Sequence, residues 1–179
     1  PYTVYQSVQD IPPMMEYDIS RGFTYMYFEG EPEFVFGHGL SYTTFDYADL
    51  TIAGAVPGGH LDVRVDVRNS GSRAGDEVVQ LYVRRVEDRA GHPKKRLVGF
   101  ERIHLEGGQA KTVRFGVSSE RLASWDERRR AWVVEPGTYE VMAGRSSADI
   151  RVRGQLHVAV PGEVLEELTN AVGNAPAKR

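Results

Sequence analysis

The 179-residue sequence contains no cysteine, and this absence removes several kinds of site at once. Without cysteine the chain forms no disulfide, no thiolate metal site and no cysteine nucleophile. Histidine is also sparse, and no two histidines form the closely spaced pair that a metal site in one short segment uses. The five residues are His38, His60, His92, His104 and His157. The sequence therefore predicts no metal site and no cofactor.

Long apolar runs and a strong charge of one sign are missing as well. No run approaches the ~20 apolar residues of a membrane-spanning helix, and the net charge is −3. A chain without a basic field does not attract nucleic acid or an anionic membrane, so we expect neither as a partner. The chain opens at Pro1 with no visible signal peptide, which leaves the compartment open. We interpret it as a piece of a longer protein.

The first part of the chain, residues 1–45, is aromatic and irregular. Proline and glycine interrupt it often enough to exclude long helices. We expect it to form a strap, an extended segment that packs on something larger, with one short strand at Tyr25–Phe28. Its aromatic residues are Tyr2, Tyr5, Tyr17, Phe23, Tyr25, Tyr27, Phe28, Phe34, Phe36, Tyr42 and Phe45.

Residues 46–160 alternate between apolar and polar side chains. Leu61, Val63, Val65 and Val67 are separated by charged residues, which is typical of a strand with one buried face. Glycine, proline and asparagine turns separate seven or eight such segments, which predicts an all-β, antiparallel, immunoglobulin-like β-sandwich. The apolar phase shifts by one residue beside Gly99, which predicts a bulge. Within residues 161–179 we expect a short amphipathic helix at 162–172 and a frayed tail.

Two features outside the predicted core are candidates for binding. Basic residues flank both ends of the loop between residues 85 and 96, and we expect them to converge: Arg84, Arg85, His92, Lys94, Lys95 and Arg96. They could contact a partner domain or a substrate entrance, or they could be solvated, salt-bridged edge residues. Trp125 could stack on a sugar ring, whereas Trp132, within an apolar segment, is expected in the core.

The joint between the strap and the sandwich has a distinctive sequence. Pro32 is followed by Phe36-Gly37-His38-Gly39-Leu40-Ser41-Tyr42-Thr43-Thr44-Phe45. This segment resembles the Pro-x-x-x-Phe-Gly-x-Gly-Leu-Ser-Tyr-Thr-x-Phe segment of glycoside hydrolase family 3, the β-glucosidases and β-xylosidases. Later blocks resemble the same family in the same order: Ala74-Gly75-Asp76-Glu77-Val78-Val79-Gln80-Leu81-Tyr82-Val83, Leu97-Val98-Gly99-Phe100, and Glu135-Pro136-Gly137-Thr138-Tyr139.

The resemblance implies a C-terminal fibronectin type III-like domain, with residues 1–45 as the exit strap from a missing α/β domain. In that family an aspartate nucleophile comes from a barrel and a glutamate acid/base usually from the α/β domain. Neither motif matches a position here, so no catalytic residue is expected in this chain. A retaining mechanism needs two carboxyl groups ~5 Å apart. We expect the chain alone to be inactive.

The predicted function is therefore a non-catalytic structural domain that buttresses the catalytic domains of the same parent enzyme. That parent would hydrolyse terminal β-D-glucosides or β-D-xylosides by a retaining mechanism, in the periplasm or outside the cell. Two alternatives stay open. One is a carbohydrate-binding module that anchors the parent to polysaccharide, and the other is a free-standing immunoglobulin-like interaction domain.

Overall fold

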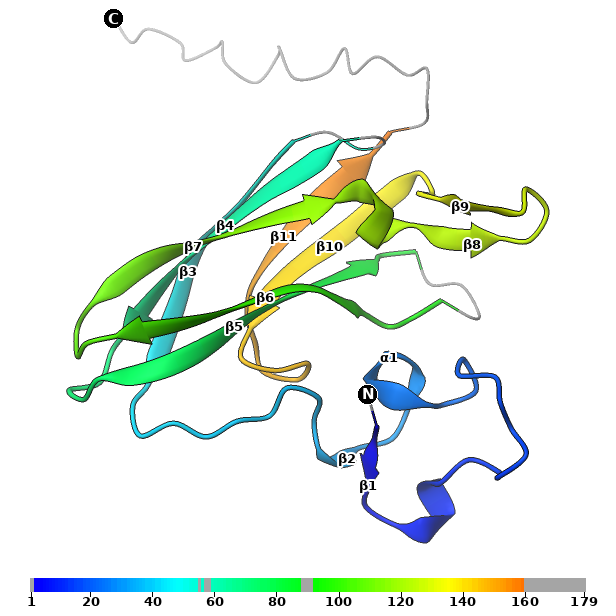
Figure 1. The fold of residues 1–179 in the computed structure, drawn as a ribbon, viewed down its shortest axis with the longest axis horizontal. Helices are drawn as coiled ribbons and strands as arrows, with labels where there is room; N and C mark the ends of the chain where they lie inside the picture. The colour runs from blue at the N-terminus through cyan, green and yellow to red at the C-terminus, as the bar shows by residue number, and fades with distance from the viewer. Residues whose placement is uncertain (1, 55, 57–58, 88–91, 160–179) are drawn as a thin grey trace, which may run out of the picture.

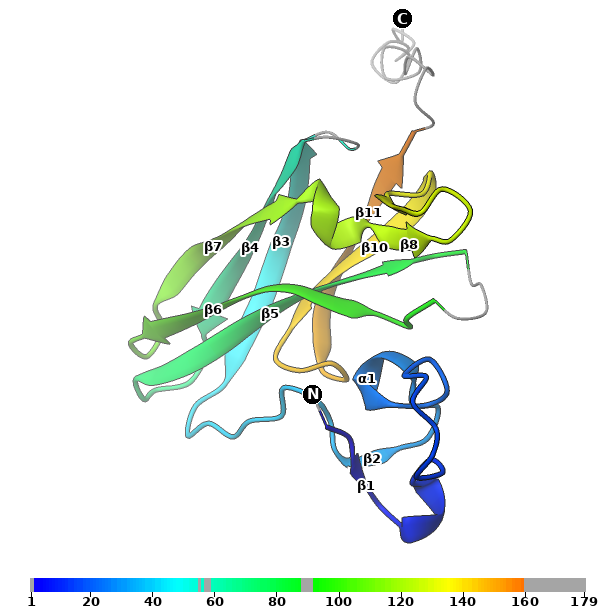
Figure 2. The same ribbon diagram turned by 45° about the vertical axis from the view of Figure 1, so that its right-hand side comes forward.

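Two antiparallel β-sheets face each other in the computed structural model, which describes residues 2–54, 56, 59–87 and 92–159 (Figures 1 and 2). The first sheet has the order β3-β4-β7 and the second the order β11-β10-β5-β6. This confirms the predicted sandwich. The first sheet comprises β3 (Phe45–Gly54), β4 (His60–Asn69) and β7 (Ala110–Ser118). The second comprises β5 (Gly75–Arg85), β6 (Arg96–Leu105), β10 (Gly137–Gly144) and β11 (Ile150–Val158).

The core lies between the two sheets and follows the alternation in the sequence. Val63, Val65 and Val67 of β4 are 0% exposed, and they face Val79 and Leu81 of β5, which are also 0% exposed. Burial of such side chains contributes roughly 1.5–3 kcal/mol each. The period of two in the sequence therefore decides which face of each strand is dry.

The predicted bulge beside Gly99 is present between β5 and β6. Leu81 pairs with Gly99 and Tyr82 with Leu97, so Val98 is an extra residue on β6. A Cβ at Gly99 would lie 3.0 Å from the Phe115 ring, which explains why the smallest residue occupies this position.

The strap forms a separate layer below one end of the sandwich, drawn in blue in both views. It contains β1 (Val4–Tyr5) paired with β2 (Pro32–Phe34), a 3₁₀ turn η1 (Val8–Asp10) and a one-turn helix α1 (Thr24–Tyr27). The strand expected at Tyr25–Phe28 is therefore wrong. The Phe28 N–H donates to the Thr24 carbonyl at 2.9 Å, which closes a helical turn instead.

The chain after Ala159, including the helix expected at 162–172, lies outside the described residues. Among the residues that are described, no helix is long and apolar enough to cross a membrane.

Candidate functional site

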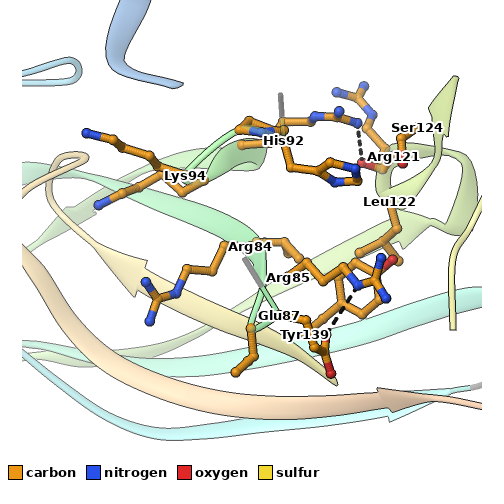
Figure 3. Close-up of a pocket in the computed structure, with 14 residues that line it drawn as sticks. Arg84, Arg85, Glu87, His92, Lys94, Arg121, Leu122, Ser124 and Tyr139 are labelled. Carbon is orange, nitrogen blue, oxygen red and sulfur yellow. Dashed lines mark hydrogen bonds and ion pairs between the residues drawn. The ribbon is translucent and has the colours of Figure 1, made fainter. Parts of the chain in front are cut away.

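A cavity of about 340 Å³ opens where β5 and β6 separate (Figure 3). Their pairing ends at Val83 and Arg96. Beyond that point β5 stays paired with β10 alone, and the Val86 N–H donates to the Thr138 carbonyl at 2.8 Å. The two diverging arms line the cavity with all of the predicted basic candidates: Arg84, Arg85, His92, Lys94, Lys95 and Arg96. Their convergence is as expected from the sequence, whereas their role is a separate question.

Arg85 is committed to holding this end of the sandwich together. Its side chain is only 12% exposed and pairs with Glu135 and with Glu87, the latter at 3.2 Å from Nε to Oε2. Its Nη2 also donates to the Pro136 carbonyl at 2.9 Å. The Thr138 N–H donates to Glu87, which is the main reason that the Glu87 pKa is lowered. Arg85 therefore clamps the end of β5 to the start of β10.

Lys94 and Lys95 extend away from the cavity toward other parts of the chain. Figure 3 shows the Lys94 side chain pointing away from Arg85 and Tyr139. Its Nζ donates to the Phe28 carbonyl at 2.7 Å and pairs with Glu29 at 2.8 Å. The Lys95 Nζ donates to the Ser147 carbonyl at 2.6 Å, and burial lowers the Lys95 pKa. Lys94 thus holds the strap, and Lys95 holds the β10–β11 turn.

Arg84 lies in a charged row across the sheet. It stands opposite Glu140 of β10, and its Nε lies 2.6 Å from Glu140 Oε2. Arg153 of β11 pairs with the other oxygen of the same carboxylate at 3.1 Å. The row is salt-bridged, as in the alternative that the sequence left open, although β5 and β10 are inner strands of their sheet.

Arg96 and Arg121 form the remaining part of the cavity wall. The Arg96 Nη1 donates to the carbonyls of Ala123 at 2.9 Å and Arg121 at 3.3 Å. Arg121 belongs to the 3₁₀ turn η2 (Ser119–Leu122), which follows β7 and folds back toward the β6 arm. Nothing in the sequence around Arg121 signals this return, so the sequence did not predict it as a site residue.

The two tryptophans lie opposite each other on a small hairpin formed by β8 (Ser124–Asp126) and β9 (Ala131–Val133). Trp125 is 51% exposed and Trp132 is 69% exposed, so the core position expected for Trp132 is wrong. Their ring centroids are 5.8 Å apart with an interplanar angle of 69°. The hairpin projects beyond the sheets in Figure 1, which agrees with the exposure of both rings.

The joint between strap and sandwich is held by aromatic rings and one amide. The Tyr25 ring stacks on Phe36 at 4.2 Å and lies edge-on to Tyr82 at 6.0 Å. The Gln80 Nε2 donates to the Gly37 carbonyl at 3.1 Å, and the Tyr82 hydroxyl donates to Gln80 Oε1 at 2.6 Å. These contacts cover the outer face of β5, which explains why Tyr82 is 0% exposed.

No metal centre is evident in the described ranges, where no three histidine or carboxylate side chains gather at one point. His38, the one histidine flanked by glycines, is exposed at the turn of the joint. Its N–H donates to the Val35 carbonyl at 3.0 Å, and its ring lies 5.6 Å from the Phe34 ring.

Comparison with known proteins places these features in a family. Residues 77–147 match the family described as "Fibronectin type III-like domain". A xylan 1,4-β-xylosidase from Xylanibacter ruminicola is 37% identical over 82% of this chain and 17% of its own length. The thermostable β-glucosidase B of Acetivibrio thermocellus is 40% identical over 72% of this chain and 17% of its own length.

Solved structures agree with these sequence relatives. The β-D-glucoside glucohydrolase of Trichoderma reesei superposes with a TM-score of 0.75 at 33% identity, over 88% of this chain and 26% of that one. The GH3 β-glucosidase of Bifidobacterium adolescentis gives a TM-score of 0.78 at 28% identity, over 88% and 25%. This chain carries the fibronectin type III-like domain of glycoside hydrolase family 3.

This chain spans about a sixth of the length of the Xylanibacter and Acetivibrio relatives. Residues 45–158 make up about two thirds of the chain, so a structural match over 88% must include part of the strap as well. Part of the strap therefore accompanies the domain in these two solved structures.

Proposed function

We propose that this chain is the non-catalytic C-terminal part of a family 3 glycoside hydrolase and that it buttresses the catalytic domains. Residues 1–45 would be the exit strap from a preceding α/β domain, and residues 46–160 the sandwich. The parent would hydrolyse terminal β-D-glucosides or β-D-xylosides, because the relatives carry those names. The chain matches only 17% of each of these relatives, which favours a structural role over a catalytic one.

The observation that carries this proposal is the exposed apolar surface of the strap. Eleven large apolar side chains of the strap are exposed, against five in the rest of the described chain. Contiguous exposed apolar surface marks a contact with another protein surface, and the concentration of exposed apolar side chains on the strap fits such a contact. The strap residues are Tyr2, Val4, Val8, Ile11, Met14, Met15, Tyr17, Ile19, Phe34, Leu40 and Tyr42.

The carboxylates of the sandwich support the same division of labour. Glu87 and Glu140 are engaged by arginines, and Asp76 pairs with His104 and Arg102. A retaining glycosidase needs one carboxylate free to attack and a second to donate a proton. We infer that both groups belong to the rest of the parent.

An activity assay tests the non-catalytic role. The pure 179-residue chain is expected to release no aglycone from aryl β-glucosides or β-xylosides. Turnover that disappears when a carboxylate of this chain is replaced would overturn the proposal.

A stability comparison tests the buttress role. We expect the triple substitution Met14→Ser, Met15→Ser and Tyr17→Ser to leave the unfolding midpoint of this chain unchanged, because all three side chains are more than three-quarters exposed. In the parent enzyme encoded by the extended reading frame, the same substitutions should lower the midpoint and the activity. Lys111→Ser on β7 is the control. Equal behaviour of the triple variant in both proteins would contradict docking of the strap.

A second function is favoured by the exposed tryptophan pair. If the chain anchors the parent to polysaccharide, it should co-sediment with insoluble glucan or xylan, and Trp125→Ala should reduce the bound fraction. We also predict that the basic loop contacts a partner domain or the substrate entrance of the parent, as part of the buttress role. Within this chain, Lys94 and Lys95 already bind neighbouring segments through the carbonyls of Phe28 and Ser147.

A further inference from the structure

The cavity between the β5 and β6 arms and the tryptophan hairpin lie next to each other. Ser124 lines the cavity, and the next residue is Trp125. We propose that together they bind an acidic saccharide, a sugar chain that carries a carboxylate. The cavity would hold the carboxylate-bearing ring, and the tryptophans would contact the neighbouring sugar.

The charge of the cavity wall selects an anion. Among the described residues that line it, six are lysine or arginine and one, Glu87, is acidic. Arg84, Arg85 and Lys94 are already paired with carboxylates, and the Lys95 Nζ donates to the Ser147 carbonyl. The charge left for a ligand is therefore that of Arg96 and Arg121, with which no carboxylate in the described chain pairs. A guanidinium presents a planar fork of donors that matches a carboxylate, and such charge-assisted bonds are about twice as strong as neutral ones.

The size and the walls of the cavity suit a sugar ring. Its volume of about 340 Å³ lies at the lower end of the ~300–1,000 Å³ typical of small-ligand sites. Leu122 and the Tyr139 ring supply apolar wall, while the Tyr139 hydroxyl is occupied by the Glu135 carbonyl at 2.9 Å. Apolar walls beside a few charged groups are the usual composition of such a site.

The tryptophan pair favours a saccharide over an acidic peptide. The two rings meet edge to face, a geometry that stabilises the pair by about 0.5–1.5 kcal/mol and still leaves ring surface exposed. An exposed indole offers an apolar face to sugar C–H groups and an N–H to a hydroxyl. A site for a peptide carboxylate alone would have no use for this pair. The turn of the same hairpin carries Arg128, Arg129 and Arg130, of which Arg129 pairs with Asp126 at 3.7 Å.

Titration calorimetry of the full 179-residue chain with trigalacturonic acid tests the proposal at low and high salt. We expect trigalacturonate to bind about ten-fold or more tightly than neutral xylotriose or cellotriose, since one charge-assisted contact is worth roughly 1.5–3 kcal/mol. The affinity should fall at higher salt. Inorganic phosphate and a hexaglutamate peptide serve as anions without sugar rings, and we expect both to bind more weakly.

Matched variants locate the site. Arg121→Ala and Trp125→Ala should each weaken trigalacturonate binding by about five-fold or more, the scale of a lost charge-assisted or aromatic contact. Arg121→Lys should retain part of the affinity. Arg114→Ala removes the same charge from an exposed position on β7 and should change affinity less than about two-fold, as expected of a distant charge in salt. Circular dichroism of each variant confirms that the sandwich is intact.

Three results would overturn the proposal. They are equal binding of phosphate or hexaglutamate, equal binding of the neutral trisaccharides, or unchanged affinity in folded Arg121→Ala. The test is independent of the buttress role, because the Met14, Met15 and Tyr17 variants should bind trigalacturonate normally. Failure of the sugar assay therefore leaves docking of the strap intact, and the reverse also holds.

Discussion

The sandwich and the strap differ in how far their apolar side chains are exposed to solvent. In the sandwich, Val65 of β4 and Leu81 of β5 are fully enclosed between the two sheets. In the strap, Met14 and Leu40 are about nine-tenths exposed. The two regions use similar side chains, so composition does not account for the contrast.

The strap itself divides into a docked part and an exposed part. Tyr25 and Phe36 pack on Tyr82, and Lys94 holds the carbonyl at Phe28. The 3₁₀ turn Val8–Asp10 and residues 11–22 make no comparable contact with the sandwich and contain no buried residue. The strap is thus fixed to the sandwich at one place and presents its remaining apolar side chains outward.

The largest expected difference comes from making one substitution in both regions. Leu81→Ala should lower the free energy of unfolding by about 2–5 kcal/mol, because it leaves a cavity between the sheets. Leu40→Ala should change it by less than about 0.5 kcal/mol, because Leu40 is 93% exposed. Urea unfolding of the 179-residue chain measures both values. Similar losses for the two variants would show that the strap buries Leu40 in solution.

A smaller effect is expected at the joint, where two glycines of one motif differ. Gly37 has a φ of +80°, and a Cβ there would lie 2.1 Å from Gln80 Oε1. A Cβ at Gly39 would meet no atom within 4 Å. Gly37→Ala should cost about 1–2 kcal/mol of backbone strain and displace the amide that holds the strap.

The measurement is tryptic cleavage at Arg21 together with hydrogen exchange of residues 23–36. Gly37→Ala should accelerate both, whereas Gly39→Ala should resemble the unmodified chain. If the two variants release the strap equally, the Gln80 contact does not hold it.

The smallest expected effect is a pH dependence of opposite sign in the two regions. Glu77 of the sandwich is 4% exposed, lies 3.2 Å from Arg145 Nε and accepts a hydrogen bond from the Tyr47 hydroxyl at 3.1 Å. Burial is the main cause that raises the Glu77 pKa. In the strap, hydrogen bonds from Ser20 lower the pKa of exposed Asp18.

The raised pKa of Glu77 means that the folded chain binds this proton more tightly than the unfolded chain. Its contribution to stability is therefore greatest below the unfolded pKa and declines as the pH rises toward the folded pKa. Asp18 acts in the opposite direction, since its contribution is present above its unfolded pKa and is lost as the pH falls.

Urea unfolding from pH 3 to pH 7 compares the unmodified chain with Glu77→Gln and Asp18→Asn. The stability difference between the unmodified chain and Glu77→Gln should become less favourable to the unmodified chain as the pH rises above about 4.5. The corresponding stability difference for Asp18→Asn should become more favourable to the unmodified chain as the pH rises through the acidic range in which Asp18 loses its proton. A pH-independent difference for Glu77→Gln would mean that Arg145 fully offsets the effect of burial.

Prediction from sequence succeeded where the structural signal is local. The alternation of Leu61, Val63 and Val65 fixes the buried face of β4, and the phase shift at Gly99 marks the bulge. It was wrong at two aromatic segments. Thr24–Tyr27 became a helical turn rather than a strand, and Trp132 is exposed on a hairpin that extends beyond the sheets.

The basic candidates are an intermediate case. Their positions on either side of one loop predicted that they would meet, and they line one cavity. The directions of their side chains were not predictable, because they depend on partners that are distant in the sequence. Arg85 turns toward the 135–138 turn, and Lys94 turns toward the strap. Arg121 was missed because it reaches the cavity only through the fold-back of η2.

The sequence by itself determined the β-sandwich and its likeness to glycoside hydrolase family 3, because a period of two and an ordered set of motifs are written along the chain. Only the tertiary structure decided which arginines face an open cavity, which lysines hold the strap and which aromatic residues stay exposed. Those outcomes depend on which distant segments meet, since a side chain is buried or free according to what packs against it. Strand register and loop direction set those meetings, and neither can be read from residue order.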